Sequence, residues 1–91
     1  MPEYGYRLKF APRIADVMQT YSPEEQDEVE RVFGLVQIDP VPDPTTKVVL
    51  TIAPAVFTVH HTRAFWVAYH VVGSEIRVVN VGRASEEPTH R

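Results

Sequence analysis

The chain has 91 residues, of which 44% are hydrophobic, and a formal net charge of -3. This length supports one small hydrophobic core, so we expect a single domain over residues 1–91. The absence of cysteine excludes disulfides, zinc-thiolate sites and cysteine nucleophiles. Because the N-terminus has no signal-peptide pattern and no apolar stretch approaches roughly 18 residues, we expect a cytoplasmic protein that does not bind membranes.

Charge is divided unevenly along the chain. Residues 22–31 hold five acidic residues against Arg31, whereas residues 45–83 hold four basic residues against Glu75. The net charge disfavours a nucleic-acid binder, because phosphate contacts need clustered Lys and Arg. The basic second half leaves that class of function open.

The first part of the chain predicts a strand and two helices. Residues 4–10 alternate apolar and small or basic side chains, as in a strand with one buried face. Residues 11–21 change to a helical period, with apolar side chains at Ile14, Val17, Met18 and Tyr21. A second helix begins after Ser22, which together with Glu25 forms a capping-box pattern, and ends near Asp39.

The second part predicts a meander of strands. Residues 47–52, 57–61, 64–72 and 75–82 are rich in β-branched and aromatic residues. Gly73 and Ser74 lie where a two-residue turn would join the last two strands, and residues 53–55 interrupt the first two. Residues 84–91 have no apolar pattern, so we expect a loose C-terminal tail after a core of about residues 4–83.

Side-chain alternation in residues 60–71 predicts one core face and one open face. Phe65, Val67 and Tyr69 point to the core, whereas Trp66 and His70 point the other way. Because two consecutive helices cover only one face of a sheet, the second face is the candidate site. The predicted core comprises Tyr6, Leu8, Phe10, Ile14, Val17, Val29, Val32, Phe33, Phe65, Val67 and Tyr69.

Two segments, "YRLKFAPRIADVM" and "FWVAYHVVGSEIRVVNVGRA", together with this order of elements, resemble the toxins of the RelE/ParE family over about residues 4–83. The resemblance implies an α+β fold of order βααβββ, an antiparallel sheet with two helices packed on one face. One additional short strand would also be compatible with the pattern.

The resemblance implies the toxin component of a bacterial toxin-antitoxin system. Members similar to RelE are ribosome-dependent mRNA endoribonucleases, or mRNA interferases, which need no metal or cofactor. Members similar to ParE inhibit DNA gyrase, and a non-catalytic interaction protein with the toxin fold is a third alternative. The implied partners are a cognate antitoxin and either the ribosome with mRNA or gyrase; a homodimer is a further hypothesis.

The candidate catalytic residues are Arg83, His61, His60 and His70. Cleavage at a 2'-hydroxyl needs a proton acceptor, a proton donor and a cation for the charge on phosphorus, which histidine and arginine can supply. Arg83 matches the family's basic residue after Val-Gly. Trp66 stands where the family carries arginine, and the tail has no tyrosine, which puts the activity in question.

The candidate nucleic-acid or partner-binding residues are Arg7, Lys9, Lys47, Arg63, Trp66 and Arg77. The cations would meet phosphates; the alternative is that they are solvated charges on strand edges. For Trp66 we favour partner contact over base stacking, with packing under the tail as the structural alternative. A metal site formed by the three histidines of the hairpin is not expected, because no cysteine and only Glu75 accompany them.

Overall fold

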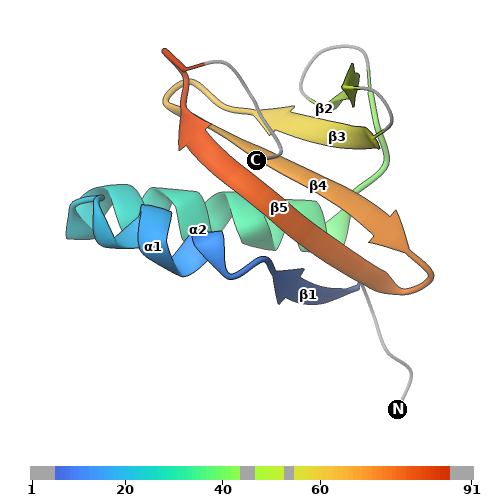
Figure 1. The fold of residues 1–91 in the computed structure, drawn as a ribbon, viewed down its shortest axis with the longest axis horizontal. Coiled ribbons are helices and arrows are strands. Elements are labelled where there is room, and N and C mark those ends of the chain that lie inside the picture. Colours follow the sequence, from blue (N-terminus) through green and yellow to red (C-terminus); the bar gives the residue numbers. More distant parts are fainter. Residues whose placement is uncertain (1–5, 44–46, 53–54, 87–91) are drawn as a thin grey trace.

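The computed structural model describes residues 6–43, 47–52 and 55–86. The elements follow one another as β1 (Arg7–Phe10), α1 (Arg13–Gln19), α2 (Pro23–Ile38), β2 (Lys47–Ile52), β3 (Ala55–His61), β4 (Phe65–Val72) and β5 (Glu75–Arg83) (Figure 1). Within these residues, no helix is both long and apolar enough to cross a membrane. The predicted interruption at residues 53 and 54 lies outside the described residues.

The strands form one five-stranded sheet in the order β1-β5-β4-β3-β2. This arrangement confirms the predicted α+β fold, with the additional strand present. The sheet is not wholly antiparallel, because β1 pairs with β5 in the parallel direction while β2 to β5 form an antiparallel meander. A parallel neighbour requires a long crossover, and here the two helices and three strands between β1 and β5 provide it.

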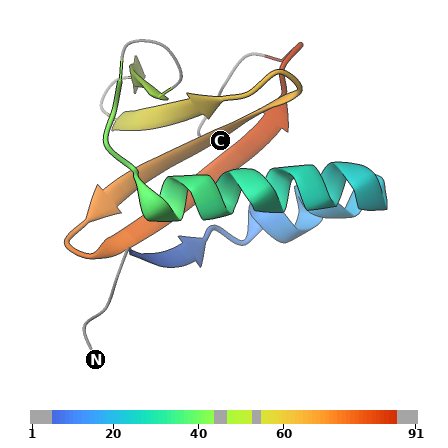
Figure 2. The ribbon, with the colours of Figure 1, turned by 180° about the vertical axis from the view of Figure 1, so that it is seen from behind.

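Both helices pack on the same face of the sheet (Figures 1 and 2). The predicted capping box starts α2: the Ser22 hydroxyl accepts from the Glu25 N–H, and the Glu25 carboxylate accepts from the Ser22 N–H. These bonds satisfy amide groups that the helix itself leaves unpaired. The start of α2 is thereby fixed beside the end of β5, where Arg83 lies.

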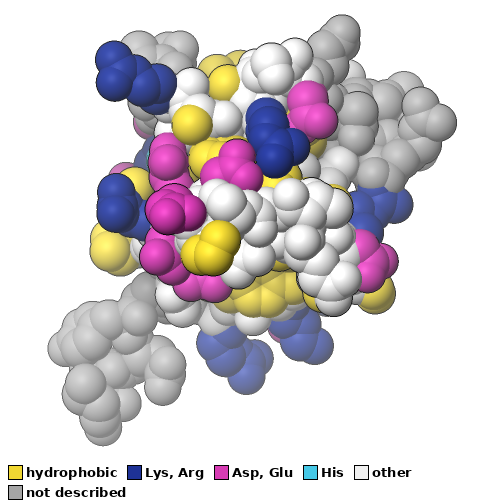
Figure 3. Space-filling view, turned by 90° about the vertical axis from the view of Figure 1, so that its left-hand side faces the viewer, with side chains coloured by type: hydrophobic (Ala, Val, Ile, Leu, Met, Phe, Trp, Pro, Cys, Tyr) yellow, Lys and Arg dark blue, Asp and Glu magenta, His cyan; other side chains and the backbone are white. Residues whose placement is uncertain are grey.

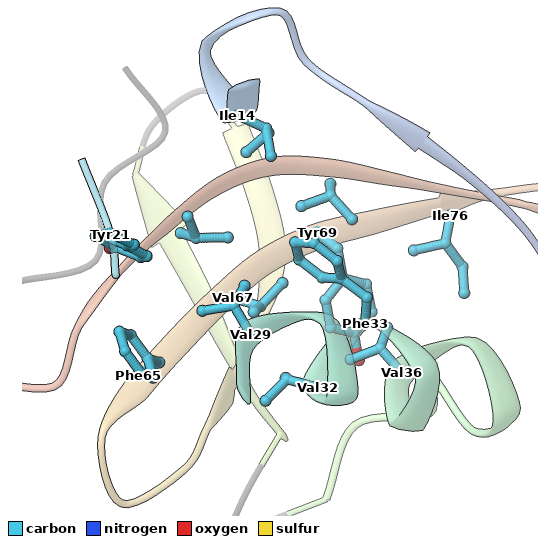
Figure 4. Close-up of a cluster of buried hydrophobic side chains, with 12 residues drawn as sticks. Ile14, Tyr21, Val29, Val32, Phe33, Val36, Phe65, Val67, Tyr69 and Ile76 are labelled. Atoms are coloured by element: carbon cyan, nitrogen blue, oxygen red, sulfur yellow. The ribbon is translucent and has the colours of Figure 1, made fainter. Parts of the chain in front are cut away.

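The main core lies between the helices and the sheet (Figure 4). It contains the predicted stripe of α2 and the predicted face of β4, together with Ile76, Val78 and Val81 of β5. Tyr21 belongs to it as well and is 5% exposed. The assignment of Phe10 to the core was wrong, because its side chain is 47% exposed. β1 ends at Phe10, at the rim of the sheet, where the ring packs against Phe33.

A second apolar cluster lies on the opposite face of the sheet, formed by Phe57, Val59, Trp66 and Ala68 with Val79 beside them. The predicted facing of β4 is therefore right, but the expectation that Trp66 is exposed was wrong. Its side chain is only 3% exposed. The face that we expected to be open is covered at this point.

A β-bulge in β5 decides which way its last residues point. Ala68 pairs with Asn80, but the next residue of β4, Tyr69, pairs with Val78, so Val79 is an extra residue. An extra residue reverses the alternation of side chains beyond it. As a result Val78 and Val81, three residues apart, both lie in the core on the helix side, and Arg83 follows on that side.

A candidate functional site around Arg83

Arg83 ends β5 and reaches the start of α2. Its Nη2 lies 3.3 Å from Glu25 Oε1 and its Nε lies 3.4 Å from Glu25 Oε2. Its guanidinium carbon also lies 4.5 Å from the centroid of the Tyr21 ring, a distance typical of a cation–π contact. Two partners thus hold the guanidinium, although 41% of the Arg83 side chain remains exposed.

The two partners differ in protonation. The backbone N–H of Ser22 and the guanidinium of Arg83 both donate to the Glu25 carboxylate and lower its pKa, the Ser22 bond being the larger cause. Burial raises the pKa of Tyr21, and the nearby Arg83 charge only partly opposes this. At neutral pH the site therefore combines a carboxylate, a guanidinium and a phenol that keeps its proton.

A pocket of about 510 Å³ opens beside Arg83 between α1 and β5. Tyr21, Trp66 and Val81 contribute apolar wall, whereas Asp16 and Glu86 contribute carboxylates. Seen from the end of the molecule at which α2 begins, acidic side chains gather in the middle of the surface (Figure 3). Arg83 is the cation among the described residues that line the pocket, and acidic groups surround it.

Residues 84–86 close over Trp66 and form part of this site. The indole N–H of Trp66 donates to the Glu86 carbonyl at 3.0 Å, and the Ala84 N–H donates to the Ala64 carbonyl at 2.8 Å. The Arg83 N–H donates to the Glu86 carboxylate at 2.7 Å. The beginning of the predicted loose tail is therefore bound to the sheet, and Trp66 packs beneath it; residues 87–91 lie outside the described part.

The structure does not bring the candidate histidines to Arg83. His60 lies opposite Val67, and its buried Nδ1 has no hydrogen-bond partner among the residues that the structure describes. Burial and, after it, the Lys47 charge lower the pKa of His60. His61 lies opposite Trp66, on the face away from the helices, and His70 lies opposite Arg77 near the other end of β4. Within the described residues, no cluster of His and acidic side chains could hold a metal ion.

The candidate basic residues are also divided among different places. Lys47 is 8% exposed, and its ammonium contacts the Asp39 carbonyl at 2.9 Å and the Asp39 carboxylate at 3.4 Å. Its expected place on a phosphate-facing surface was therefore wrong, because it anchors the chain after α2. Arg63 is exposed in the turn between β3 and β4. Arg7, Lys9 and Arg77 instead gather around Glu75 at the far end of β5.

The chain is similar to known proteins in its three-dimensional structure rather than in its sequence. No family model and no curated sequence matches the chain. A chain of the toxin-antitoxin complex RelBE2 from Mycobacterium tuberculosis superimposes with a TM-score of 0.74 at 14% identity, covering 93% of this chain and 98% of that one. A mutant of the E. coli toxin RelE in the free state, with two arginines replaced by alanine, gives a TM-score of 0.56 at 14% identity, covering 88% and 84%. The chain has the RelE-type toxin fold.

Proposed function

We propose that this chain is the cytoplasmic toxin component of a bacterial toxin-antitoxin system, which a cognate antitoxin neutralises. The observation that carries the proposal is the fold, which matches the E. coli toxin RelE and a chain of the RelBE2 complex over most of the length of both. The match to an antitoxin complex supports an antitoxin as the partner. The resemblance of the two sequence segments to the same family supports it independently.

For the mode of action we propose RelE-like cleavage of mRNA on the ribosome. Arg83 would stabilise the charge that develops on phosphorus, since a cation held by two partners needs little reorganisation. Tyr21 retains its proton and would donate it to the leaving oxygen, while the Glu25 carboxylate beside Arg83 would accept the proton of the attacking 2'-hydroxyl. The histidines have no place in this scheme, because they do not lie with Arg83.

One observation favours the alternative of a gyrase inhibitor or a non-catalytic interaction protein. Arg83 is already paired with Glu25, and the pocket beside it carries the carboxylates of Asp16 and Glu86. The negative carboxylates of Asp16 and Glu86 would repel the negative phosphate of an RNA. The phosphate would also have to displace Glu25 from the guanidinium of Arg83. A target that is bound without cleavage makes no such demand on Arg83.

Cell-free translation of a defined message with the purified protein distinguishes these modes. Primer extension should reveal new message ends that require ribosomes and that vanish with Arg83→Ala. These ends should persist with Arg31→Ala, which removes an exposed arginine of α2. Circular dichroism should first show that both variants fold. Uncut message, with cleaved DNA accumulating in a gyrase assay, would establish the gyrase alternative.

The toxin role itself has a separate test. Induced expression of the chain should arrest growth of a bacterial host, and coexpression of an antitoxin that co-purifies with it should restore growth. If strong expression of soluble protein leaves growth unchanged, the toxin role is wrong and the non-catalytic alternative remains.

A further inference from the structure

A cluster of basic side chains lies on the sheet face opposite the helices, where β1 runs beside the start of β5. Arg7 pairs in register with Glu75, and Lys9 pairs with Arg77. His70 of β4 is the neighbour of Arg77 on the other side. Because their chain neighbours Leu8 and Ile76 belong to the main core, alternation places all these side chains on the opposite face.

Glu75 organises this cluster from within. Its carboxylate accepts from Arg77 Nε at 2.8 Å and lies 3.8 Å from Lys9 Nζ. The Glu75 side chain is only 16% exposed, whereas those of Lys9 and Arg77 are 71% and 51% exposed. The largely covered Glu75 carboxylate therefore orients two cations that still face the solvent, and Arg7 adds a third positive charge beside them.

The surface at this point is hollowed. A pocket of about 330 Å³ is lined by Lys9, His70, Arg77 and Val79, together with residues at the end of β1. The centre of the cluster is charged, which is unlike a protein interface, whose centre is apolar or aromatic and depleted of charge. Sequence-independent binding of a polynucleotide, by contrast, comes mainly from cations that contact its phosphates.

We propose that Arg7, Lys9 and Arg77 bind the phosphodiester backbone of single-stranded nucleic acid. Arg7 and Lys9 are two residues apart on one strand face, about 6.6 Å along the strand, so they can contact different phosphates of one extended chain. Arg77 lies on the adjacent strand and widens this row of cations. We refer to Arg7, Lys9 and Arg77 together as the track. RNA is the class that follows from the proposed function, whereas the binding itself does not depend on cleavage.

The proposed track is separate from the Arg83 site. Arg77 and Arg83 are six residues apart in β5, about 20 Å along an extended strand, and the bulge at Val79 turns them to opposite faces. Binding of nucleic acid and the chemistry at Arg83 can therefore be removed independently. A substitution in the track that lowers the affinity for nucleic acid should leave the contacts of Arg83 with Glu25 and Tyr21 unchanged.

The test is fluorescence anisotropy of a labelled oligouridylate of about 12 nucleotides with the full chain, starting at about 20 mM salt. Three phosphate contacts to a single strand predict a slope of about -2 for the logarithm of affinity against the logarithm of salt concentration. Arg77→Gln should weaken binding about tenfold at low salt and reduce the slope by about 0.7. Arg31→Gln, the matched control at an exposed arginine of α2, should leave both unchanged.

A second variant gives a change of the opposite sign. Glu75→Gln removes the negative charge within the cluster and should tighten binding several-fold, which a variant that merely damages the fold cannot do. The proposal is overturned if the wild-type chain does not bind the oligonucleotide, or if Arg31→Gln weakens binding as much as Arg77→Gln. It is also overturned if Glu75→Gln weakens binding.

A polyglutamate peptide of about 12 residues serves as the competing probe. If it binds more tightly than the oligonucleotide and responds to Arg77→Gln, the cluster is a site for an acidic protein segment and the proposal is wrong. The assay contains no ribosomes, so its outcome does not decide the proposed mRNA cleavage. If the chain cleaves message on the ribosome but does not bind the oligonucleotide, the proposed nucleic-acid binding by Arg7, Lys9 and Arg77 is wrong and the proposed mRNA cleavage stands.

Discussion

The guanidinium of Arg83 lies over the ring of Tyr21, 4.5 Å from its centroid. Tyr21 is itself held in place, because its ring packs against that of Phe65 with the ring centroids 5.4 Å apart. The end of the last strand is thus tied to the connection between the two helices. Arg83 is oriented by the core as well as by its ion pair with Glu25.

The bonds that the Glu25 carboxylate accepts, first from the Ser22 N–H and then from Arg83, should appear in the acid dependence of stability. The pKa of Glu25 is lowered in the folded protein, so its contribution is present above the ordinary glutamate pKa of about 4.3 and is lost as pH falls through the folded value. Glu25→Gln keeps a residue suited to the capping box while removing the charge. Its urea midpoint should therefore vary less between about pH 5 and pH 3.

Glu24→Gln is the matched control, since it removes a charge from the same helical turn of α2. It should keep the acid dependence of the wild-type chain. If Glu25→Gln and the wild-type chain lose stability equally over this range, the carboxylate does not contribute in the way that the geometry indicates.

The contact of Gly82 with Trp66 predicts opposite effects for two glycine substitutions. A Cβ at Gly82 would collide with the Trp66 ring, whereas a Cβ at Gly34 would meet none of the described atoms within 4 Å. Gly82→Ala should destabilise the fold by about 1–3 kcal/mol through overpacking. Gly34→Ala should stabilise α2 by roughly 0.5–1 kcal/mol. Thermal unfolding measures both, and a neutral Gly82→Ala would show that residues 84–86 do not hold Trp66 in place.

Tyr69 should show the value of one buried hydrogen bond. Its hydroxyl donates to the Pro40 carbonyl at 2.7 Å, and its ring is fully buried in the core. Tyr69→Phe keeps the ring but leaves that carbonyl without its donor, so we expect a loss of about 1–3 kcal/mol in chemical denaturation. An unchanged denaturation midpoint would mean that the chain after α2 is not held by this bond.

His60 should make stability fall as pH drops below neutral. Its pKa is lowered in the fold, mainly by burial and then by Lys47, so the unfolded chain takes up a proton at higher pH than the folded one does. Stability is therefore full above the ordinary histidine pKa of about 6.5 and decreases below it. His60→Gln should flatten the profile between about pH 7 and pH 5.

Local patterns predicted the elements and much of the core. The helical period of residues 11–21 and the capping box at Ser22 mark α1 and α2, and the alternation around Phe65 gives the correct facing of β4. These features depend on neighbours in the chain, which a sequence displays directly. The same alternation placed Trp66 on the face away from the helices, where it lies.

The contacts that define the site could not be predicted in this way. Glu25 and Arg83 are 58 residues apart, and the capping box fully explains Glu25 in the sequence. The bulge at Val79 is invisible to a period of two, and it changes the face on which Arg83 lies. The cover over Trp66 comes from the backbone of Glu86, which no side-chain pattern records.

The parallel pairing of β1 with β5 has a consequence for synthesis of the protein. β1 is synthesised before β5, which is its one strand neighbour in the described structure. The five-stranded sheet therefore cannot be completed until β5 has been synthesised. Contacts between residues so far apart in the sequence also form slowly. A nascent chain that stops before β5 would lack both the partner of β1 and Arg83, so the complete sheet and the Arg83 site form together.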